Sequence, residues 1–172
     1  MNCSIIRKWR LSDASDLAVA LNNKKILDNL RDGIPFPYTQ ADAAAFISEM
    51  LNSDPDKIFA FAITADGKAV GSVALYRGSN VHFRTAELGY YLAEPYWGKG
   101  FATRAVGEAC RYVFENTDIL RIFAEPFAYN SASCRVLEKN GFLHEGTLKC
   151  NAVKNGTLLD MQMYALIKSN KY

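Results

Sequence analysis

The spacing of apolar residues along the chain changes period several times, and each period indicates a different element. The longest periodic run covers residues 101–116, where apolar side chains recur at the spacing of one helix face. The charged side chains of this run fall on the opposite face: Arg104, Glu108, Arg111 and Glu115. The run therefore predicts an amphipathic helix that buries its apolar face against the rest of the chain.

Shorter apolar runs predict strands on both sides of that helix. They occupy residues 5–9, 59–64, 69–77, 85–92, 121–125, 143–151 and 157–167. Two connections between them, Asp66-Gly67 and Asn155-Gly156, are residue pairs that favour tight hairpin turns. The sequence thus predicts two hairpins, and the first continues into a third antiparallel strand at residues 85–92.

Polar residues in front of three segments mark the starts of further helices. The expected N-caps are Ser12, Thr39 and Asn130, and the helices behind them run to about residues 22, 51 and 140. The order is then strand, two helices, three strands, helix, strand, helix and two strands. We therefore expect a single α/β domain over residues 1–172, with a mixed, mostly antiparallel central sheet flanked by helices.

Composition and charge exclude some classes of partner. Of the 172 residues, 49% are hydrophobic and 22% are charged, which is ordinary for a globular protein. The formal net charge of +2 is too small to argue for nucleic acid or an anionic membrane as a partner. No apolar stretch approaches the roughly 20 residues of a membrane helix, and the first residues lack the apolar core of a signal peptide. We expect a cytoplasmic protein.

The cysteines are too widely spaced to predict a metal site or a disulfide framework. They stand at Cys3, Cys110, Cys134 and Cys150, and the only histidines are His82 and His144. No C-x-x-C pair occurs, so we expect reduced thiols and no bound metal.

Two glycines between the 85–92 strand and the long helix predict a turn that can bind an anion. Gly98 and Gly100 have no Cβ, so the chain can turn sharply there and the helix N-terminus can present several N–H groups to a phosphate. Lys99 and Arg104 add positive charge. The spacing fits neither the P-loop nor the dinucleotide-binding fingerprint, because no Ser or Thr follows Lys99 and Thr103 stands where a third small residue is needed.

The run Trp97-Gly98-Lys99-Gly100-Phe101-Ala102 resembles the pyrophosphate loop of the GNAT superfamily of acyl-CoA N-acyltransferases, and in particular its RimJ/RimL-like branch. A second run, residues 129–142, resembles a cofactor-side motif of the same family, with N-x-x-S at its start and E-K-x-G-F at its end. Residues 87–90, Glu-Leu-Gly-Tyr, resemble the family's strand before the loop. The match extends over nearly the whole chain.

The resemblance implies acetyl-CoA as donor and a primary amine as acceptor. The donor would lie between the 85–92 and 121–125 strands, which splay apart, with its pyrophosphate on the N–H groups of residues 98–102 and its pantetheine along the edge of residues 88–93. A strand N–H at Tyr91 or Leu92 would polarise the thioester carbonyl. The expected cofactor-binding residues are Tyr91, Leu92, Trp97, Gly98, Lys99, Gly100, Phe101, Ala102, Thr103, Asn130 and Ser133.

Three side chains are the candidates for proton transfer. Glu87 is the best-placed carboxylate to accept a proton from the amine, although a salt-bridged strand glutamate would give the same pattern. Some relatives protonate the CoA thiolate with a Tyr in the helix after N-x-x-S, where this chain has Leu137. Ser133 or Tyr129 must then serve, unless water does.

The irregular stretch from residue 28 to residue 38 is the expected acceptor pocket, because two prolines hold it extended between helices. The candidate substrate-binding residues are Asp28, Arg31, Asp32 and Tyr38. Asp28 and Asp32 could attract a cationic amine, or they could be turn residues. The alternative place for the pocket is the hairpin tip at residues 151–157.

The leading hypothesis is therefore an N-acetyltransferase that forms an amide by direct transfer to a protein N-terminus or to a small-molecule amine. A non-catalytic acyl-CoA-binding sensor, or a scaffold of the same fold that binds a protein partner, is the competing interpretation. The sequence does not separate the classes of acceptor. A homodimer is common among such relatives.

Overall fold

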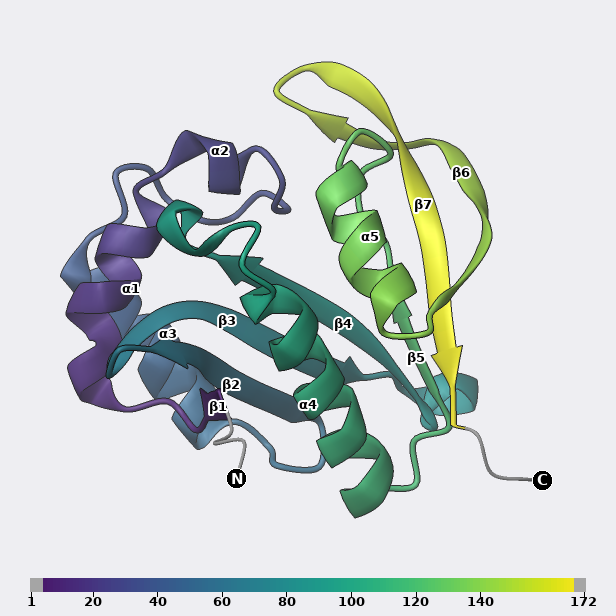
Figure 1. The fold of residues 1–172 in the computed structure, drawn as a ribbon, viewed down its shortest axis with the longest axis horizontal. Helices are drawn as coiled ribbons and strands as arrows, with labels where there is room; N and C mark the ends of the chain where they lie inside the picture. Colours follow the sequence, from purple (N-terminus) through teal and green to yellow (C-terminus); the bar gives the residue numbers. More distant parts are fainter. Residues whose placement is uncertain (1–4, 169–172) are drawn as a thin grey trace.

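The computed structural model describes residues 5–168, which form one seven-stranded sheet with helices on both faces (Figure 1). The strands are β1 (Ile6–Arg7), β2 (Ile58–Ala65), β3 (Lys68–Arg77), β4 (Thr85–Leu92), β5 (Arg121–Ala124), β6 (Leu143–Lys154) and β7 (Thr157–Ile167). They lie in the order β1-β2-β3-β4-β5-β7-β6, and all neighbours are antiparallel except β4 and β5. The expected fold class is confirmed. Residues 1–4, with Cys3, and residues 169–172 lie outside the described part.

The helices are α1 (Ala14–Leu21), α2 (Lys24–Leu27), α3 (Gln40–Asn52), α4 (Phe101–Asn116) and α5 (Ser131–Lys139). Short 3₁₀ turns occur at Leu11–Asp13, Asn80–His82 and Glu94–Tyr96. Two apolar clusters join them to the sheet. One holds α4 and α5 against one face, with Val106 and Leu137 fully buried, and the other holds α1 and α3 against the opposite face, with Leu17 and Ile47 fully buried (Figure 1).

The pairing between β4 and β5, in the middle of the sheet, is short. The two strands are joined through α4 and run parallel, and they pair only over Thr85, Ala86 and Glu87. β4 then continues to Leu92, while β5 ends at Ala124. Within the described chain no strand pairs with this edge of β4 beyond Glu87, and the two ribbons diverge there (Figure 1). We call residues 88–92 on this side the open edge of β4.

Most predicted elements are confirmed, and the local signals explain why. Thr39 and Asp42 form the expected capping box: Asp42 N–H donates to Thr39 Oγ1 at 3.1 Å and Thr39 N–H donates to Asp42 Oδ2 at 2.8 Å. Asn130 caps α5 by accepting a hydrogen bond from Ser133 N–H at 3.1 Å. The first strand is shorter than expected, since β1 covers only Ile6–Arg7.

At the N-terminal side one expectation is wrong and one helix was not predicted. Ser12 is not the N-cap of the first helix, because it lies inside a 3₁₀ turn and Asp13 holds the N-cap position. The Asp13 side chain makes no cap bond and instead binds Arg7 and the Arg10 N–H. The sequence also gave no signal for α2, whose four residues are too few to reveal a helical period.

No helix in residues 5–168 has both the length and the apolar character needed to cross a membrane.

Asp13 is a buried charged residue that is bound by several hydrogen bonds. Its carboxylate is 4% exposed and accepts two hydrogen bonds from Arg7, each at 2.7 Å, and one from Arg10 N–H at 2.9 Å. Burial by itself raises the pKa of Asp13, but the hydrogen bonds from Arg7 and Arg10 together outweigh it. The pKa of Asp13 therefore lies below its usual value.

We expect Asp13→Asn to lower the free energy of unfolding by about 2 kcal/mol near neutral pH, on the scale of charge-assisted hydrogen bonds to a buried group. Because the pKa is lower in the folded state, the wild-type advantage is complete above the unfolded-state pKa of about 3.9 and is lost as pH falls through the folded-state pKa. Urea unfolding across this pH range measures it. Asp66→Asn, in the β2–β3 turn, is the control and should change little; equal stability of the Asp13 variant and wild type at neutral pH would contradict the assignment.

Candidate functional site

Along the open edge of β4, the backbone N–H and C=O groups of every second residue point away from β3. Ala93 N–H donates to Val70 on β3 at 2.7 Å, whereas Arg84 C=O, on the other side, accepts from Leu120 N–H at 2.9 Å. Because backbone groups alternate along a strand, the N–H and C=O of Tyr90 and Leu92 point toward the open edge and those of Tyr91 point toward β3. Of the two expected N–H donors, Leu92 is thus the one on the open edge.

The side chains of β4 alternate between the two faces of the sheet. Leu88 and Leu92 are buried in the cluster with α4 and α5, and Tyr90 packs against the same cluster. Tyr91 packs into the opposite cluster, and burial raises its pKa well above the ordinary value. The open edge therefore lies between two chemically different faces, one beside α4 and α5 and one beside α2 and α3.

The glycine turn lies at the end of the open edge and before α4. Gly98 and Gly100 have φ of 72° and 82°, a region that favours glycine, and an added Cβ on either would meet no atom within 4 Å. The first helical hydrogen bond runs from Arg104 N–H to Gly100 C=O at 3.0 Å. The N–H groups of residues 101–103 thus have no acceptor within the helix and face the space beside the turn.

The Trp97 side chain connects the glycine turn to the end of β4. Its indole N–H donates to Leu92 C=O at 2.6 Å, so the side chain fastens the turn to the last residue of β4. Beside it, Lys99 Nζ lies 5.9 Å from the centre of the Tyr96 ring, and Tyr96 packs edge-on against Phe101 at 5.6 Å. These contacts fix the turn without placing a side chain over its glycines.

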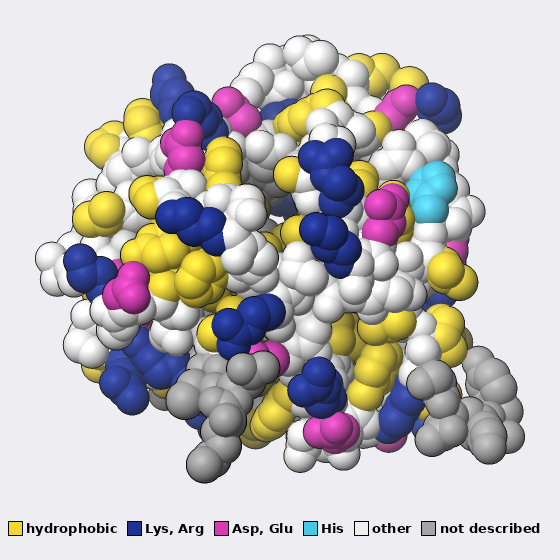
Figure 2. All heavy atoms as spheres, in the orientation of Figure 1, with side chains coloured by type: hydrophobic (Ala, Val, Ile, Leu, Met, Phe, Trp, Pro, Cys, Tyr) yellow, Lys and Arg dark blue, Asp and Glu magenta, His cyan; other side chains and the backbone are white. Residues whose placement is uncertain are grey.

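Lysine and arginine side chains are exposed on the face that carries α4 and α5 (Figure 2). Exposed members of the group are Lys99, Arg104, Arg135 and Lys139. Positive charge next to a helix N-terminus favours an anionic ligand such as a phosphate.

Ser133, at the start of α5, is paired with a tyrosine that the sequence did not single out. The hydroxyl oxygens of Tyr90 and Ser133 are 2.7 Å apart, and Tyr90 also lies 3.1 Å from Ser133 C=O. Burial raises the pKa of Tyr90 well above its ordinary value, so the phenol is neutral and can donate a hydrogen bond. Leu137, one helical turn further, is fully buried in the core.

Glu87 is held in a group of three charged side chains on the other face. Arg31, from the loop after α2, forms an ion pair with Glu87 and also reaches Glu125 at 3.4 Å. The Glu125 side chain is only 20% exposed. Burial and then the charge of Glu87 raise the pKa of Glu125, and Arg31 only partly offsets them. We call Glu87 and Glu125 the carboxylate pair.

The two expected places for an acceptor pocket adjoin each other. Asp32 binds Lys154 at 2.6 Å, and the Asp28 side chain accepts a hydrogen bond from Asn155 Nδ2 at 3.3 Å. Tyr129, which stacks on Phe127, donates from its hydroxyl to Asp28 C=O. The 28–38 loop and the tip of the β6–β7 hairpin therefore form one continuous rim, which we call the acceptor rim.

Tyr38 lies apart from that rim. Its side chain is 6% exposed and belongs to the core cluster of α1 and α3, and burial raises its pKa. Its backbone is fastened to Asn22, whose amide donates to Tyr38 C=O at 2.6 Å and accepts from Tyr38 N–H at 2.9 Å. Tyr38 thus supports the loop at its base.

The structure brings together the turn at 97–102, Ser133, Glu87 and the acceptor rim around the open edge of β4. Sequence reasoning missed Tyr90 and Glu125, and it included Lys154 and Asn155 only as part of the hairpin tip that was the alternative place for the pocket. Glu125 could have been found from alternation: it follows Phe123, which pairs with Glu87, by two positions and so shares its face. The pairing of Tyr90 with Ser133 could not have been found from the sequence, because only the fold places α5 beside β4.

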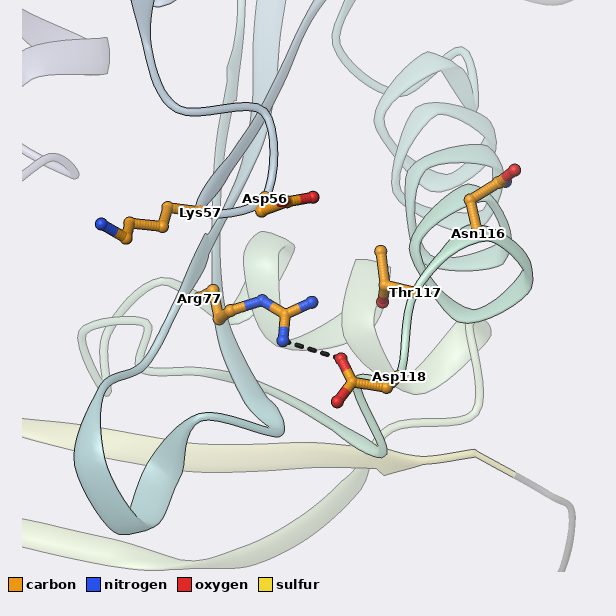
Figure 3. Close-up of a pocket in the computed structure, with 6 residues that line it drawn as sticks. All are labelled: Asp56, Lys57, Arg77, Asn116, Thr117 and Asp118. Carbon is orange, nitrogen blue, oxygen red and sulfur yellow. Dashed lines mark hydrogen bonds and ion pairs between the residues drawn. The ribbon is translucent and has the colours of Figure 1, made fainter.

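A separate surface hollow lies at the other end of the sheet (Figure 3). It is lined by Asp56, Lys57, Arg77, Asn116, Thr117 and Asp118, and Arg77 is bound there to Asp118 at 2.7 Å. None of the expected site residues contributes to this hollow. Among residues 5–168, no group of His, Cys, Asp or Glu is arranged to hold a metal ion.

Known proteins resemble this chain over much of its length. The chain is 34% identical over 119 residues to a probable N-acetyltransferase, YjcK of Bacillus subtilis (strain 168), a match that covers 69% of this chain and 66% of YjcK. It is 27% identical over 167 residues to the uncharacterized N-acetyltransferase p20 of Bacillus licheniformis, covering 95% of this chain and 92% of p20. The chain therefore spans just under two thirds of YjcK and nearly all of p20.

A solved structure has the same fold. The crystal structure of a ribosomal-protein-S5-alanine acetyltransferase from Vibrio fischeri superposes with a TM-score of 0.85 at 24% identity, covering 96% of this chain and 93% of that one. The family model of the acetyltransferase (GNAT) domain matches residues 4–143, which include the glycine turn, the open edge and the start of α5. The chain belongs to the GNAT acetyltransferase family, as its sequence motifs indicated.

Proposed function

We propose that this protein is an acetyl-CoA-dependent N-acetyltransferase, which forms an amide by direct transfer to a primary amine. The observation that carries the proposal is the open edge of β4, which runs between an anion-binding turn and a carboxylate pair. A structural neighbour, the microcin C7 self-immunity acetyltransferase MccE, is known in complex with acetyl-CoA and AMP. The homodimer that the resemblance implies, and the cytoplasmic location expected from the sequence, belong to the same proposal.

The donor side of the site fits coenzyme A. The N–H groups of residues 98–102 bind the pyrophosphate, and Lys99 and Arg104 add charge to that interaction. The pantetheine amides hydrogen-bond along the open edge as an added strand does, and Asn130 stands at the start of α5 beside them. Leu92 N–H then donates to the thioester oxygen, where negative charge develops during attack.

The acceptor approaches from the face that carries the carboxylate pair. An amine near neutral pH is mostly protonated, and its nitrogen must lose a proton before it can attack the thioester carbon. Glu87 accepts a proton from this nitrogen, directly or through one water molecule. Its ion pair with Arg31 holds the carboxylate in position until the amine arrives.

The departing thiolate receives its proton on the opposite face. Ser133 donates a hydrogen bond to the sulfur, and Tyr90, 2.7 Å from Ser133 Oγ, supplies a second hydroxyl to the relay. A serine hydroxyl is a weak acid, so the main effect is to stabilise the developing charge and to pass a proton along. Tyr129 instead donates a hydrogen bond to Asp28 C=O and so connects the segment before α5 to the acceptor rim.

Two classes of acceptor fit the rim. Relatives in Escherichia coli include a ribosomal-protein-serine acetyltransferase at 28% identity and a spermidine N(1)-acetyltransferase at 32% identity, and both names describe primary amines. Acidic groups at Asp28, Asp32, Glu87 and Glu125 outnumber the basic Arg31 and Lys154 around the entrance. This charge balance favours a cationic amine in either class.

A thiol-release assay tests the function. The purified chain is given acetyl-CoA with spermidine, with peptides that carry N-terminal serine or alanine, and with no acceptor, and mass spectrometry follows the amide product. Acetylation of at least one amine supports the proposal. Slow hydrolysis without amide formation would favour an acyl-CoA sensor, and failure to bind acetyl-CoA would favour a scaffold.

We expect Gly100→Val to weaken acetyl-CoA binding more than about tenfold, or roughly 1.4 kcal/mol, because the branched side chain stands where the pyrophosphate approaches. Calorimetric titration measures this affinity. Gly67→Val is the matched control, since Gly67 also has a positive φ of 79° and open space around it but lies in the β2–β3 turn. A folded Gly100 variant with wild-type affinity would remove the turn from the site.

We expect Glu87→Gln to lower kcat/KM by about 10²–10⁴, the range for a lost general base. The deficit should shrink as pH rises, because the amine then loses its proton without help. Steady-state rates from about pH 6 to pH 10 give the profile, with Glu49→Gln, an exposed carboxylate of α3, as the unaffected control. Full activity of the Glu87 variant at every pH would exclude Glu87 as the base.

We expect Ser133→Ala to lower kcat about tenfold to a hundredfold, on the scale of one charge-assisted hydrogen bond, with KM for the acceptor unchanged. Tyr90→Phe should reduce kcat in the same direction and by a smaller factor, because Ser133 keeps its own hydroxyl. Melting temperatures of both variants are the control. Normal turnover with only a lower melting temperature would limit Ser133 to its place in the α5 cap.

A further inference from the structure

Direct acetyl transfer to an amine removes two protons from one nitrogen. A protonated amine loses the first before it attacks, and the nitrogen of the tetrahedral intermediate loses the second when the amide forms. The C–N bond forms and the C–S bond breaks, so the thiolate takes up one proton and the other leaves to solvent. A centre with a single base must release its first proton before it can accept the second.

The structure places two carboxylates where one nitrogen can reach both. Glu87 is the last residue of β4 that pairs with β5, opposite Phe123, and Glu125 lies two positions beyond Phe123. The two side chains therefore share the face of the sheet on which Arg31 lies, and Arg31 Nη2 contacts both. They stand where the strands part, at the beginning of the open edge.

We propose that Glu125 is a second catalytic carboxylate, so that Glu87 and Glu125 each accept one of the two protons lost by the acceptor nitrogen in a turnover, with Arg31 as the positioning residue between them. This inference rests on the proposed acetyl transfer. The proposal does not depend on which carboxylate accepts the first proton.

Arg31 is suited to this role by its place between the two groups. Its side chain is 63% exposed and belongs to the irregular loop after α2, so it can shift between the carboxylates at little cost. With both carboxylates ionised the group of three carries one negative charge, which attracts a cationic amine. After one carboxylate is protonated, Arg31 stays paired with the other and keeps it ionised.

The charges around the pair are compatible with two successive proton transfers. Burial and the neighbouring Glu87 raise the pKa of Glu125, so this group gains a proton more readily than an isolated Glu. Arg31 is the cation that faces both groups, and Tyr76 on β3 interacts with Glu87. At the acceptor rim the charged groups are Asp28, Asp32 and Lys154.

Single and double variants of the full chain test the proposal. Glu125→Gln, Glu87→Gln and the double variant are assayed with acetyl-CoA and the amine that the wild type acetylates best. The pH is varied across the pKa of that amine, about 8 for an N-terminus or about 10.4 for a lysine-like amine. Below this pKa we expect Glu125→Gln to lower kcat/KM at least about tenfold and the double variant to exceed either single loss.

Above the pKa of the amine the nitrogen arrives neutral and has one proton left to lose. Each single variant should then approach the wild-type rate, whereas the double variant should stay slow because no carboxylate remains. A Glu125→Gln enzyme as fast as the wild type at low pH would overturn the proposal. So would a double variant that matches Glu87→Gln at every pH.

The pH dependence of kcat/KM tests the positioning role of Arg31. We expect Arg31→Gln to move the acidic limb of the kcat/KM profile to higher pH, since the two carboxylates lose their shared cation, and Arg31→Lys to restore it in part. A profile unmoved by Arg31→Gln would overturn the positioning role. Glu145→Gln is the matched control, because Glu145 is bound by Arg121 at the far end of β5 and should change neither rate nor profile.

The same set of assays separates the two levels of inference. A wild type that acetylates an amine while Glu125→Gln is equally active leaves the proposed function intact and overturns only the role of Glu125. A wild type that acetylates none of the amines overturns the proposed function, and the role of Glu125 falls with it.

Discussion

Beyond Glu87, β4 is no longer paired with β5, although it lies in the middle of the sheet. The candidate site depends on this unpaired edge. β5 ends at Ala124, and the segment after it does not pair with β4. On its other side the same segment stays paired: Pro126 C=O accepts from Gln162 N–H at 2.9 Å, and Phe127 bridges to Met161. The sheet thus holds together through β7 while an interior strand keeps an edge that a ligand with amide groups can complete.

The segment after α1 packs into the cluster of α1 and α3 through Ile26, Leu27 and Leu30, and polar contacts from distant parts of the chain also hold it over this edge. Glu94 binds Asn23 and Lys25 on α2, the carboxylate pair binds Arg31, and the hairpin tip binds Asp28 and Asp32. Exposed ion pairs contribute little individually, about 0–1 kcal/mol. These ion pairs therefore add little to the cost of displacing the segment, which suits a region beside the proposed path of the acceptor. Glu94 also stands in the turn that leads to the glycines, so the donor and acceptor sides share one support.

Local signals predicted most of this architecture. The period of α4, the capping box at Thr39 and the turn at Asp66-Gly67 are each encoded within a few residues, and each is present in the fold. The contacts that complete the site depend on distant pairs and could not be predicted in that way. Tyr90 meets Ser133 across 43 positions, and Lys154 meets Asp32 across 122. Tyr38 stood in an irregular, proline-rich stretch that resembled exposed loop, and only the packing of α1 against α3 reveals that its ring is buried.

The two hydrogen bonds between Asn22 and the backbone of Tyr38 fix both ends of the intervening segment at one point of the core. Between these anchors Ile26 is buried, at 3% exposed, and Leu27, Leu30 and Ile34 pack against the same cluster while remaining partly exposed. Since the cost of closing a loop grows only slowly with its length, the stretch between these anchors can change in length and composition while both cores and the donor side keep their packing. The fold therefore separates the segment proposed to select the acceptor from the part of the chain proposed to bind the donor. Under that proposal, exchange of this one short segment, in evolution or by grafting, changes the acceptor preference and leaves the donor side intact.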